Sequence, residues 1–328
     1  MNGVLIIDKP VRITSHDVVA RCRRILKTKR IGHTGTLDPF ATGVMVILVG
    51  QATRLAQFLD KDAKEYEAVV RLGFETDTGD FTGSPKPEAQ SSKFKVQSSK
   101  TVSAAEIEDV LKEFRGEIEQ TPPMYSAKKV AGKKLYELAR AGIEIERKPC
   151  KVTIYELEMI QPPKKNELRI TNYELREETN RPPTTDHRSL NDFGLRVLCS
   201  AGTYIRVLAE EIGKKLETGA HLAALRRTRA GNFDLSKAVT LEELEEIVAA
   251  QKLDEILISM NKAVAHLPKV VLSETEIKQT QNGTKLRFAN NEMKDNQAVR
   301  MIDKAENLIA VGFYDQREKT VQPRVVLI

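Results

Sequence analysis

The sequence predicts an α+β fold, on three observations. Strand-like and helix-like segments are intermixed, without the regular alternation of a doubly wound sheet. The chain has 328 residues, of which 41% are hydrophobic, enough to fill a core. After about residue 260 the pattern changes to short strand-like runs separated by turn residues. We therefore expect a large domain over residues 1–260 and a small β-rich domain over residues 261–328.

Five segments of the large domain have strand patterns. Residues 3–8 form an apolar run that suits a buried strand. The run 44–49 is short, continuous and apolar, which fits either a buried strand or a short buried helix. Residues 66–72 alternate with a period of two, which places Tyr66 on the apolar face. Two further strands are predicted at residues 152–160 and 195–199.

Helices are predicted from capping residues and from apolar spacing. Ser15 is the predicted N-cap of the first helix. Capping boxes predict two others that begin at Ser103 and Thr240, each with a Glu three residues later. Apolar positions at helical spacing predict two more helices, at residues 135–141 and 205–216.

Two polar segments, residues 84–101 and 161–193, have the composition of inserted loops, and we expect both to be mobile. The C-terminal domain is predicted from four strand-like runs. They cover residues 270–272, 298–302, 308–313 and 324–328.

Positive charge is clustered along the chain, although the net charge is only +6. The clusters are residues 21–30, the lysines at 128, 129, 133 and 134, and the arginines at 226, 227 and 229. A single cluster of this kind is usually solvated surface. Three of them favour a polyanionic partner such as nucleic acid.

The composition argues against several other classes of protein. Three scattered cysteines without metal-ligand spacing suit a reducing cytosol, and predict neither a disulfide framework nor a zinc site. No apolar run is long enough to span a bilayer, and the first ten residues lack the basic start of a signal peptide. We expect a cytoplasmic protein with no membrane segment.

The most distinctive loop runs from His33 to Pro39, with the sequence His-Thr-Gly-Thr-Leu-Asp-Pro. It is polar and contains no Gly-Lys-Ser/Thr ending, so it is not a phosphate-binding P-loop. Taken alone, Asp38 before Pro39 is typical of a turn.

The motifs of the chain, taken together and in order, resemble those of the TruB family of pseudouridine synthases. The likeness extends over residues 3–233, and the tail after residue 260 is similar to the PUA-like RNA-binding domain of bacterial members. The motifs are Asp8-Lys9-Pro10 with Thr14-Ser15, His33 to Gly43, Lys64-x-Tyr66, Thr76-Asp77-Thr78-x-Asp80, Gln120 to Lys129, Leu135-Tyr136-x-x-Ala139-Arg140, Gly202-Thr203-Tyr204-Ile205-Arg206, Gly219-Ala220-His221-Leu222 and Leu225-Arg226-Arg227-Thr228.

The resemblance implies a mixed, mainly antiparallel central sheet flanked by helices. It also implies that the protein isomerises uridine 55 in the T-loop of tRNA to pseudouridine, without metal or other cofactor, and assists tRNA folding. Asp38 would be the catalytic carboxylate, acting at the ribose as nucleophile or as base once the uridine has flipped out. Arg206 would pair with Asp38 and keep it ionised at neutral pH.

The resemblance also assigns supporting roles. Tyr66 would stack on the target base and is a candidate for handling the C5 proton, and His33 would support the flipped-out arrangement. Lys9 and Tyr204 would shape the active site. Phosphates would be held by Lys129, Lys133, Arg226 and Arg227.

Three positions depart from the family pattern: Arg12 stands where Gly is usual, Arg54 where Lys is usual, and Ala201 where a basic residue is usual. Two alternative functions remain open. The protein could be an RNA-binding or tRNA-folding protein whose catalysis is dispensable, or it could modify sites chosen by a guide RNA within a larger complex. The compact N-terminus and short C-terminal domain favour a stand-alone enzyme of bacterial type, acting as a monomer without an obligate protein partner.

Overall fold

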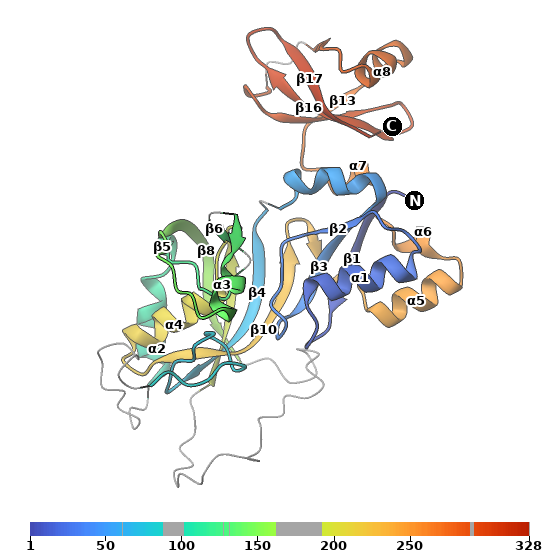
Figure 1. Cartoon of the computed structure of the whole chain (residues 1–328). Helices are drawn as coiled ribbons and strands as arrows, with labels where there is room; N and C mark the ends of the chain where they lie inside the picture. Colours follow the sequence, from blue (N-terminus) through green and yellow to red (C-terminus); the bar gives the residue numbers. More distant parts are fainter. Residues whose placement is uncertain are drawn as a thin grey trace.

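The computed structural model describes residues 1–60, 62–87, 102–126, 128–130, 132–161, 192–288 and 292–327. Its strands form a ten-stranded sheet, a five-stranded sheet and a two-stranded hairpin within these ranges (Figure 1). Most of the two predicted inserted loops, 84–101 and 161–193, lies outside the described residues.

The large sheet has the order β12-β1-β3-β10-β4-β9-β8-β5, with β2 beside β3 and β11 beside β10. Only the β1–β12 and β3–β10 pairs are parallel. This confirms the predicted mixed, mainly antiparallel α+β sheet. Its strands are β1 (Gly3–Lys9), β2 (Ile31–Thr34), β3 (Thr42–Val49), β4 (Lys64–Leu72), β5 (Gly116–Gln120), β8 (Cys150–Ile160), β9 (Asp192–Cys199), β10 (Ala220–Ala230), β11 (Phe233–Asp234) and β12 (Ala238–Val239).

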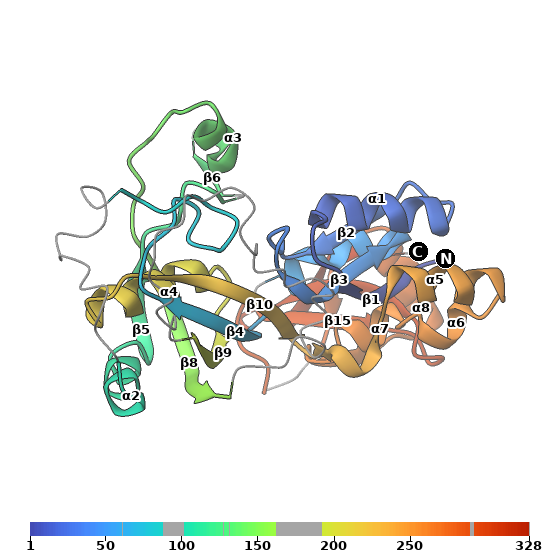
Figure 2. The same cartoon turned by 90° about the horizontal axis from the view of Figure 1, so that it is seen from below.

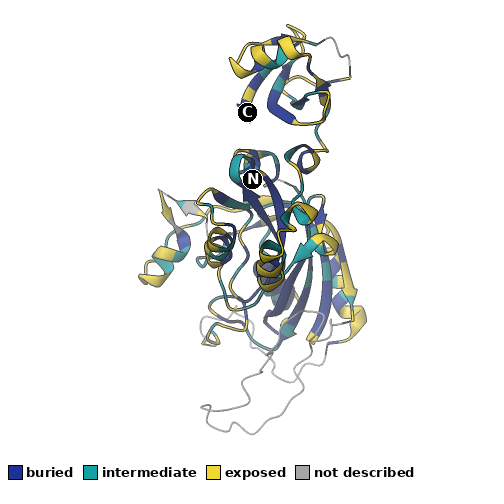
Figure 3. Ribbon diagram, turned by 90° about the vertical axis from the view of Figure 1, so that its right-hand side faces the viewer, coloured by how far each residue is buried: buried dark blue, intermediate teal, exposed yellow. Residues whose placement is uncertain are grey.

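Strands β1 and β3 are covered on both faces, which explains why their sequences are apolar throughout. On one face, Leu5 and Met45 pack with α1 (Ser15–Ile25) and α5 (Leu241–Ala249). On the other, alternate residues pack with the 3-10 helix η1 (Gly50–Phe58) and with the C-terminal sheet. The run 44–49, for which the sequence left strand and helix open, is therefore a central strand. Figure 3 shows that the strands of the large sheet are largely buried.

The other half of the sheet has one covered face at β4, so its sequence alternates. Tyr66, Ala68, Val70 and Leu72 enter a single core, as predicted. Helices α2 (Ala104–Lys112) and α4 (Ile205–Lys215) contribute to this core, and Figure 2 shows them at the end of the sheet opposite α1 and α5.

The helix starts match the sequence with one correction. The predicted capping boxes at Ser103 and Thr240 are present. The first helix, however, is capped by Thr14, whose side chain accepts a hydrogen bond from the amide of Asp17. Ser15 is instead buried, and its hydroxyl exchanges two hydrogen bonds with the backbone of Leu37, at 2.9 and 3.0 Å. The sequence could not separate two adjacent residues that both suit an N-cap.

The small sheet has the order β13-β15-β16-β17-β14, and helix α8 (Glu274–Gln281) packs against it. Its strands are β13 (Lys269–Val271), β14 (Leu286–Arg287), β15 (Ala298–Ile302), β16 (Leu308–Asp315) and β17 (Thr320–Val326). The remaining elements are the hairpin β6 (Lys129–Val130) and β7 (Lys133–Lys134), α3 (Leu135–Arg140), η2 (Leu235–Lys237), α6 (Leu253–Ile256) and α7 (Met260–Ala263). No helix in the described part of the chain is long and apolar enough to cross a membrane.

Candidate active site

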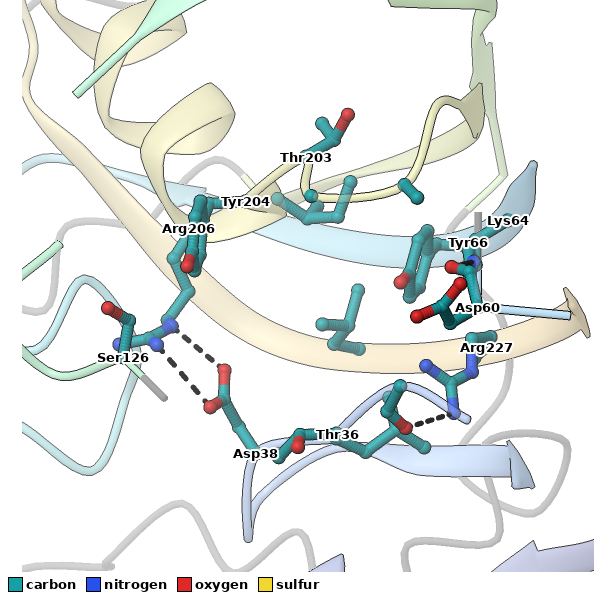
Figure 4. Close-up of a pocket in the computed structure, with 16 residues that line it drawn as sticks. Thr36, Asp38, Asp60, Lys64, Tyr66, Ser126, Thr203, Tyr204, Arg206 and Arg227 are labelled. Atoms are coloured by element: carbon teal, nitrogen blue, oxygen red, sulfur yellow. Dashed lines mark hydrogen bonds and ion pairs between the residues drawn. The ribbon is translucent and has the colours of Figure 1, made fainter. Parts of the chain in front are cut away.

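A cavity of about 270 Å³ opens where the loop between β2 and β3 meets β4, β10 and the start of α4 (Figure 4). Asp38 enters it from the loop, Tyr66 from β4 and Arg206 from the first turn of α4. These three predicted catalytic residues are far apart in sequence. The fold brings them together around one cavity.

The loop that carries Asp38 is held by buried polar groups. The ammonium group of Lys9 donates hydrogen bonds to the carbonyls of Pro10, Pro39 and Ala41, at 3.0, 3.2 and 2.7 Å. Lys9 is completely buried, and this burial lowers its pKa to about 8. Lys9 thus holds the backbone of the loop that carries Asp38, and it does not line the cavity itself.

Arg206 joins Asp38 to two other segments. Its Nε lies 2.9 Å from Oδ2 of Asp38, and its Nη2 lies 3.3 Å from Oδ1. The same guanidinium donates to the carbonyls of Thr78 and Tyr125, each at 2.7 Å, and lies 3.8 Å from a carboxylate oxygen of Asp80. Such multiple bonding fixes the orientation of the guanidinium plane toward Asp38.

The Asp38 carboxyl group is subject to two opposing effects. Burial raises its pKa, and the charge of Arg206 opposes that rise, while Asp80 adds to it. Arg206 thus favours the charged form as its position suggests, but desolvation, which the sequence does not show, opposes it. That Asp38 stays ionised at neutral pH remains a prediction. About a third of the Asp38 side chain (34%) remains open to the cavity.

On the far side of the cavity, Tyr66 lies opposite Arg227 in the register of β4 and β10. Burial raises the pKa of the Tyr66 phenol, and the charge of Arg227 lowers it. The phenol therefore stays protonated at neutral pH. Lys64, on the same strand as Tyr66, also lines this side.

The chain matches two family models in succession. Residues 23–205 match the N-terminal domain of the TruB family of pseudouridylate synthases, and residues 206–265 match the C-terminal domain of tRNA pseudouridylate synthase B. This chain belongs to the TruB family. The predicted resemblance is confirmed, and Arg206 is the first residue of the second match.

Relatives within the TruB family match along most of their length. The tRNA pseudouridine synthase B of Geobacillus thermodenitrificans is 45% identical over 88% of this chain and 86% of its own. That of Bacillus subtilis is 38% identical over 100% of this chain and 98% of its own. Among solved structures, a Cbf5-Nop10-Gar1 complex gives a TM-score of 0.70 at 27% identity, and an H/ACA RNP bound to a substrate RNA gives 0.69 at 26%. Both matches cover 99% of this chain and 85% of the other.

Two further residues that match motifs of the TruB family, Tyr204 and His33, lie at or near the cavity. Tyr204 lines it directly, and its backbone exchanges two hydrogen bonds with the side chain of Gln120. His33 does not line it. Its ring lies 6.0 Å from that of His16, and its Nδ1 is buried without a hydrogen-bond partner in the described part of the chain. Burial lowers the pKa of His33, so the ring is neutral at neutral pH.

The predicted phosphate-binding residues separate into two groups. Arg226 and Arg227 are buried. Arg226 forms a bidentate ion pair with Asp8, at 2.8 and 3.0 Å, which speaks against a direct contact with phosphate. Lys133 is exposed on the β6–β7 hairpin, as a phosphate contact requires, whereas the side chain of Lys129 lies outside the described residues.

Sequence reasoning assigned no role to several residues that the structure places at the site. Gln120 supports Tyr204, and Lys64, Asp60 and Ser126 line the cavity. Lys64 and Gln120 belong to motifs that the chain shares with the TruB family, so the sequence could have indicated them. Asp60 carries no such signal, because only the turn between η1 and β4 brings it to the cavity.

Proposed function

We propose that this protein isomerises uridine 55 in the T-loop of tRNA to pseudouridine. The names of its bacterial relatives support the reaction and the tRNA substrate. The observation that carries the proposal is the ion pair of Asp38 and Arg206 in a cavity that also contains Tyr66. The volume of about 270 Å³ lies below the roughly 300–1,000 Å³ of sites for drug-sized ligands, which suits one flipped-out nucleobase.

The proposed roles follow from position and chemistry. Asp38 acts at C1′ or at a neighbouring sugar proton, since it is the carboxylate that faces the cavity from the loop. Arg206 keeps Asp38 oriented and favours its charged form. Tyr66 stacks on the base, and its protonated phenol must first ionise if it is to accept the C5 proton. His33 supports the flipped nucleotide from outside the cavity.

The test uses a T-stem-loop transcript in single-turnover reactions. Wild type should form pseudouridine, and Asp38→Asn should form none above background, because the amide can neither attack nor accept a proton. Asp109→Asn, an exposed carboxylate on α2, is the matched control and should retain wild-type activity. Product formation by Asp38→Asn at the wild-type rate would refute the assignment of the catalytic carboxylate.

A role in tRNA folding is proposed in addition, because basic side chains are exposed on the small sheet, away from the cavity. Arg287 and Arg324 are examples. We propose that this sheet and the neighbouring residues form an RNA-binding domain over residues 261–328, packed against the large sheet. Asp38→Asn should then restore the folding of a misfolded tRNA as well as wild type does. Loss of this rescue in Asp38→Asn would tie any folding effect to catalysis.

We further propose a cytoplasmic, stand-alone monomer. The full-length match to bacterial synthases supports this, while the solved relatives are described as complexes with partner proteins or RNA. Light scattering on the purified protein should give the mass of one chain, and modification of the transcript should need no guide RNA. Activity that appears only after a guide RNA is added would favour the complex-bound alternative.

A further inference from the structure

The cavity is electrically asymmetric. Asp38 and its partner Arg206 stand on one side, and Lys64 and Arg227 stand on the other (Figure 4). The two cations on the far side are deeply buried, with relative exposures of 5% for Lys64 and 1% for Arg227.

Neither cation has a carboxylate ion-pair partner among the residues that the structure describes. Arg227 donates from Nε to the carbonyl of Val44 at 2.7 Å and from Nη2 to the carbonyl of Gly35 at 3.2 Å. Lys64 donates to the backbone carbonyls of Asp60 and Asp62. These acceptors are neutral, so they satisfy hydrogen bonds without balancing charge.

The neighbouring residue shows how an acidic partner can balance a buried cation. Arg226 pairs with the buried Asp8 through both oxygens. Burying a charge without such a partner destabilises the folded state by roughly several kcal/mol. Hydrogen bonds to carbonyls do not offset this cost, so they do not explain why a charged Arg227 is buried here.

Two acids, Asp60 and Asp62, lie near Lys64 at this end of the cavity, but neither forms an ion pair with it in the described part of the chain. Asp60 lines the cavity, but its side chain is exposed, and water screens its charge. Burial, and after it the charge of Arg227, lower the pKa of Lys64, while the carboxylates of Asp62 and Asp60 oppose this shift without reversing it. The two cations therefore repel each other. A negative ligand or intermediate at this end would relieve that repulsion.

The proposed isomerisation produces such an anion. Breaking the bond between C1′ and N1 leaves the electron pair on uracil, while the carboxylate of Asp38 compensates the positive charge at C1′. A new bond then forms from C5 to C1′ with electrons of the base, C5 loses its proton and N1 gains one. Atoms and electrons balance without an added reagent.

We propose that Arg227, assisted by Lys64, is a further catalytic group that contacts the detached uracil and stabilises its negative charge. This inference rests on the proposed function. Arg227 lies on the central strand β10, opposite Tyr66, and its guanidinium donates to the carbonyls of Val44 and Gly35. The guanidinium is therefore oriented before the charge on the uracil develops. Oriented donors of this kind act mainly on the transition state.

The experiment varies the stability of the leaving anion. Single-turnover cleavage of the C1′–N1 bond is measured on T-stem-loop RNA that carries uridine or 5-fluorouridine, whose more acidic base leaves more easily. Arg227→Gln should slow uridine cleavage by about 10²–10³-fold, and 5-fluorouridine cleavage by clearly less. Arg227→Lys should recover most of the rate, since it restores the charge. Arg196→Gln, an exposed arginine on β9, is the control and should stay near wild type.

Equal slowing of both RNAs by Arg227→Gln would overturn the inference, because a merely structural defect does not depend on the leaving group. If circular dichroism shows that Arg227→Gln is unfolded, the two RNAs are compared with Lys64→Met instead. It should slow uridine cleavage more than 5-fluorouridine cleavage, and equal slowing would refute the inference. Failure of the proposed function gives a different result, since wild type would then cleave neither RNA.

Discussion

At the scale of single residues, Arg206 decides the geometry of the site. Its guanidinium contacts Asp38, the carbonyls of Thr78 and Tyr125, and the carboxylate of Asp80. These groups come from three separate segments, the loop of Asp38, the motif that contains Thr78 and Asp80, and the segment of Tyr125, so one buried side chain sets their relative positions. Its loss should change both the position and the ionisation of Asp38.

We predict that Arg206→Gln shifts the acid limb of the pH–rate profile to higher pH. Asp38 must be ionised to act, so activity falls as the pH drops through its pKa. The charge of Arg206 lowers that pKa against the effect of burial, and its removal lets the pKa rise further. The measurement is kcat between pH 5 and 9, with RNA binding followed separately. A lower kcat with an unmoved acid limb would contradict the electrostatic role.

Arg12 occupies a position where the backbone favours glycine. Its φ of 71° lies in the left-handed region, and its amide donates to the carbonyl of Pro39 next to Asp38. Arg12→Gly should therefore raise the free energy of unfolding by roughly 0.5–1 kcal/mol, since it relieves strain and keeps the hydrogen bond. Urea unfolding measures this. Arg24→Gly, within α1, is the control and should lower the free energy by about as much.

At the scale of elements, helix α1 is tied to the catalytic loop. Thr14 caps the helix, while Ser15 bonds to both backbone groups of Leu37, the neighbour of Asp38. Two adjacent residues thus have separate tasks. One stabilises the helix, and the other places the loop.

We predict that Ser15→Ala lowers kcat about tenfold, because it leaves the buried backbone groups of Leu37 unpaired and frees the loop. Thr14→Ala is the matched control. It should cost about 1 kcal/mol of stability through the lost cap and leave kcat nearly unchanged. Both are measured by single-turnover kinetics and urea unfolding. An equal loss of kcat in the two variants would show that only helix stability matters.

At the scale of the whole molecule, the small sheet shares a core with the large one. Val311 of β16 belongs to the same buried cluster as Val4 of β1 and Leu55 of η1. The rings of Phe58 and Phe313 meet across this contact, with centroids 6.2 Å apart. The two sheets are therefore not independent bodies joined by a linker.

We predict that Val311→Ala, which creates a void in this shared core, speeds amide hydrogen exchange in β1 and η1 as well as in β16. Val299→Ala is the control, because its fully buried side chain packs only within the small sheet. Its effect should stay in that sheet. Hydrogen-exchange mass spectrometry distinguishes the two patterns, and exchange confined to β16 in Val311→Ala would mean that the shared core contributes little.

Much of the fold followed from local patterns. The capping boxes at Ser103 and Thr240 and the alternation after Tyr66 were confirmed because each depends on neighbours along the chain. The cap at Thr14 was missed because Thr and Ser suit an N-cap equally well. The burial of the arginines of β10 was not predicted, because a cluster of charge in sequence does not show which side chains a central strand buries.

The sequence by itself determined the α+β class, the family and the identity of Asp38, Tyr66 and Arg206 as the residues of interest. These follow from periodicity and motif order, which are written along the chain. Only the tertiary structure decided what surrounds them. Desolvation of Asp38, the bonding of Arg227 to backbone carbonyls and the link from Ser15 to Leu37 arise from contacts between distant segments. Such contacts set dielectric and charge balance in three dimensions, and no local pattern contains them.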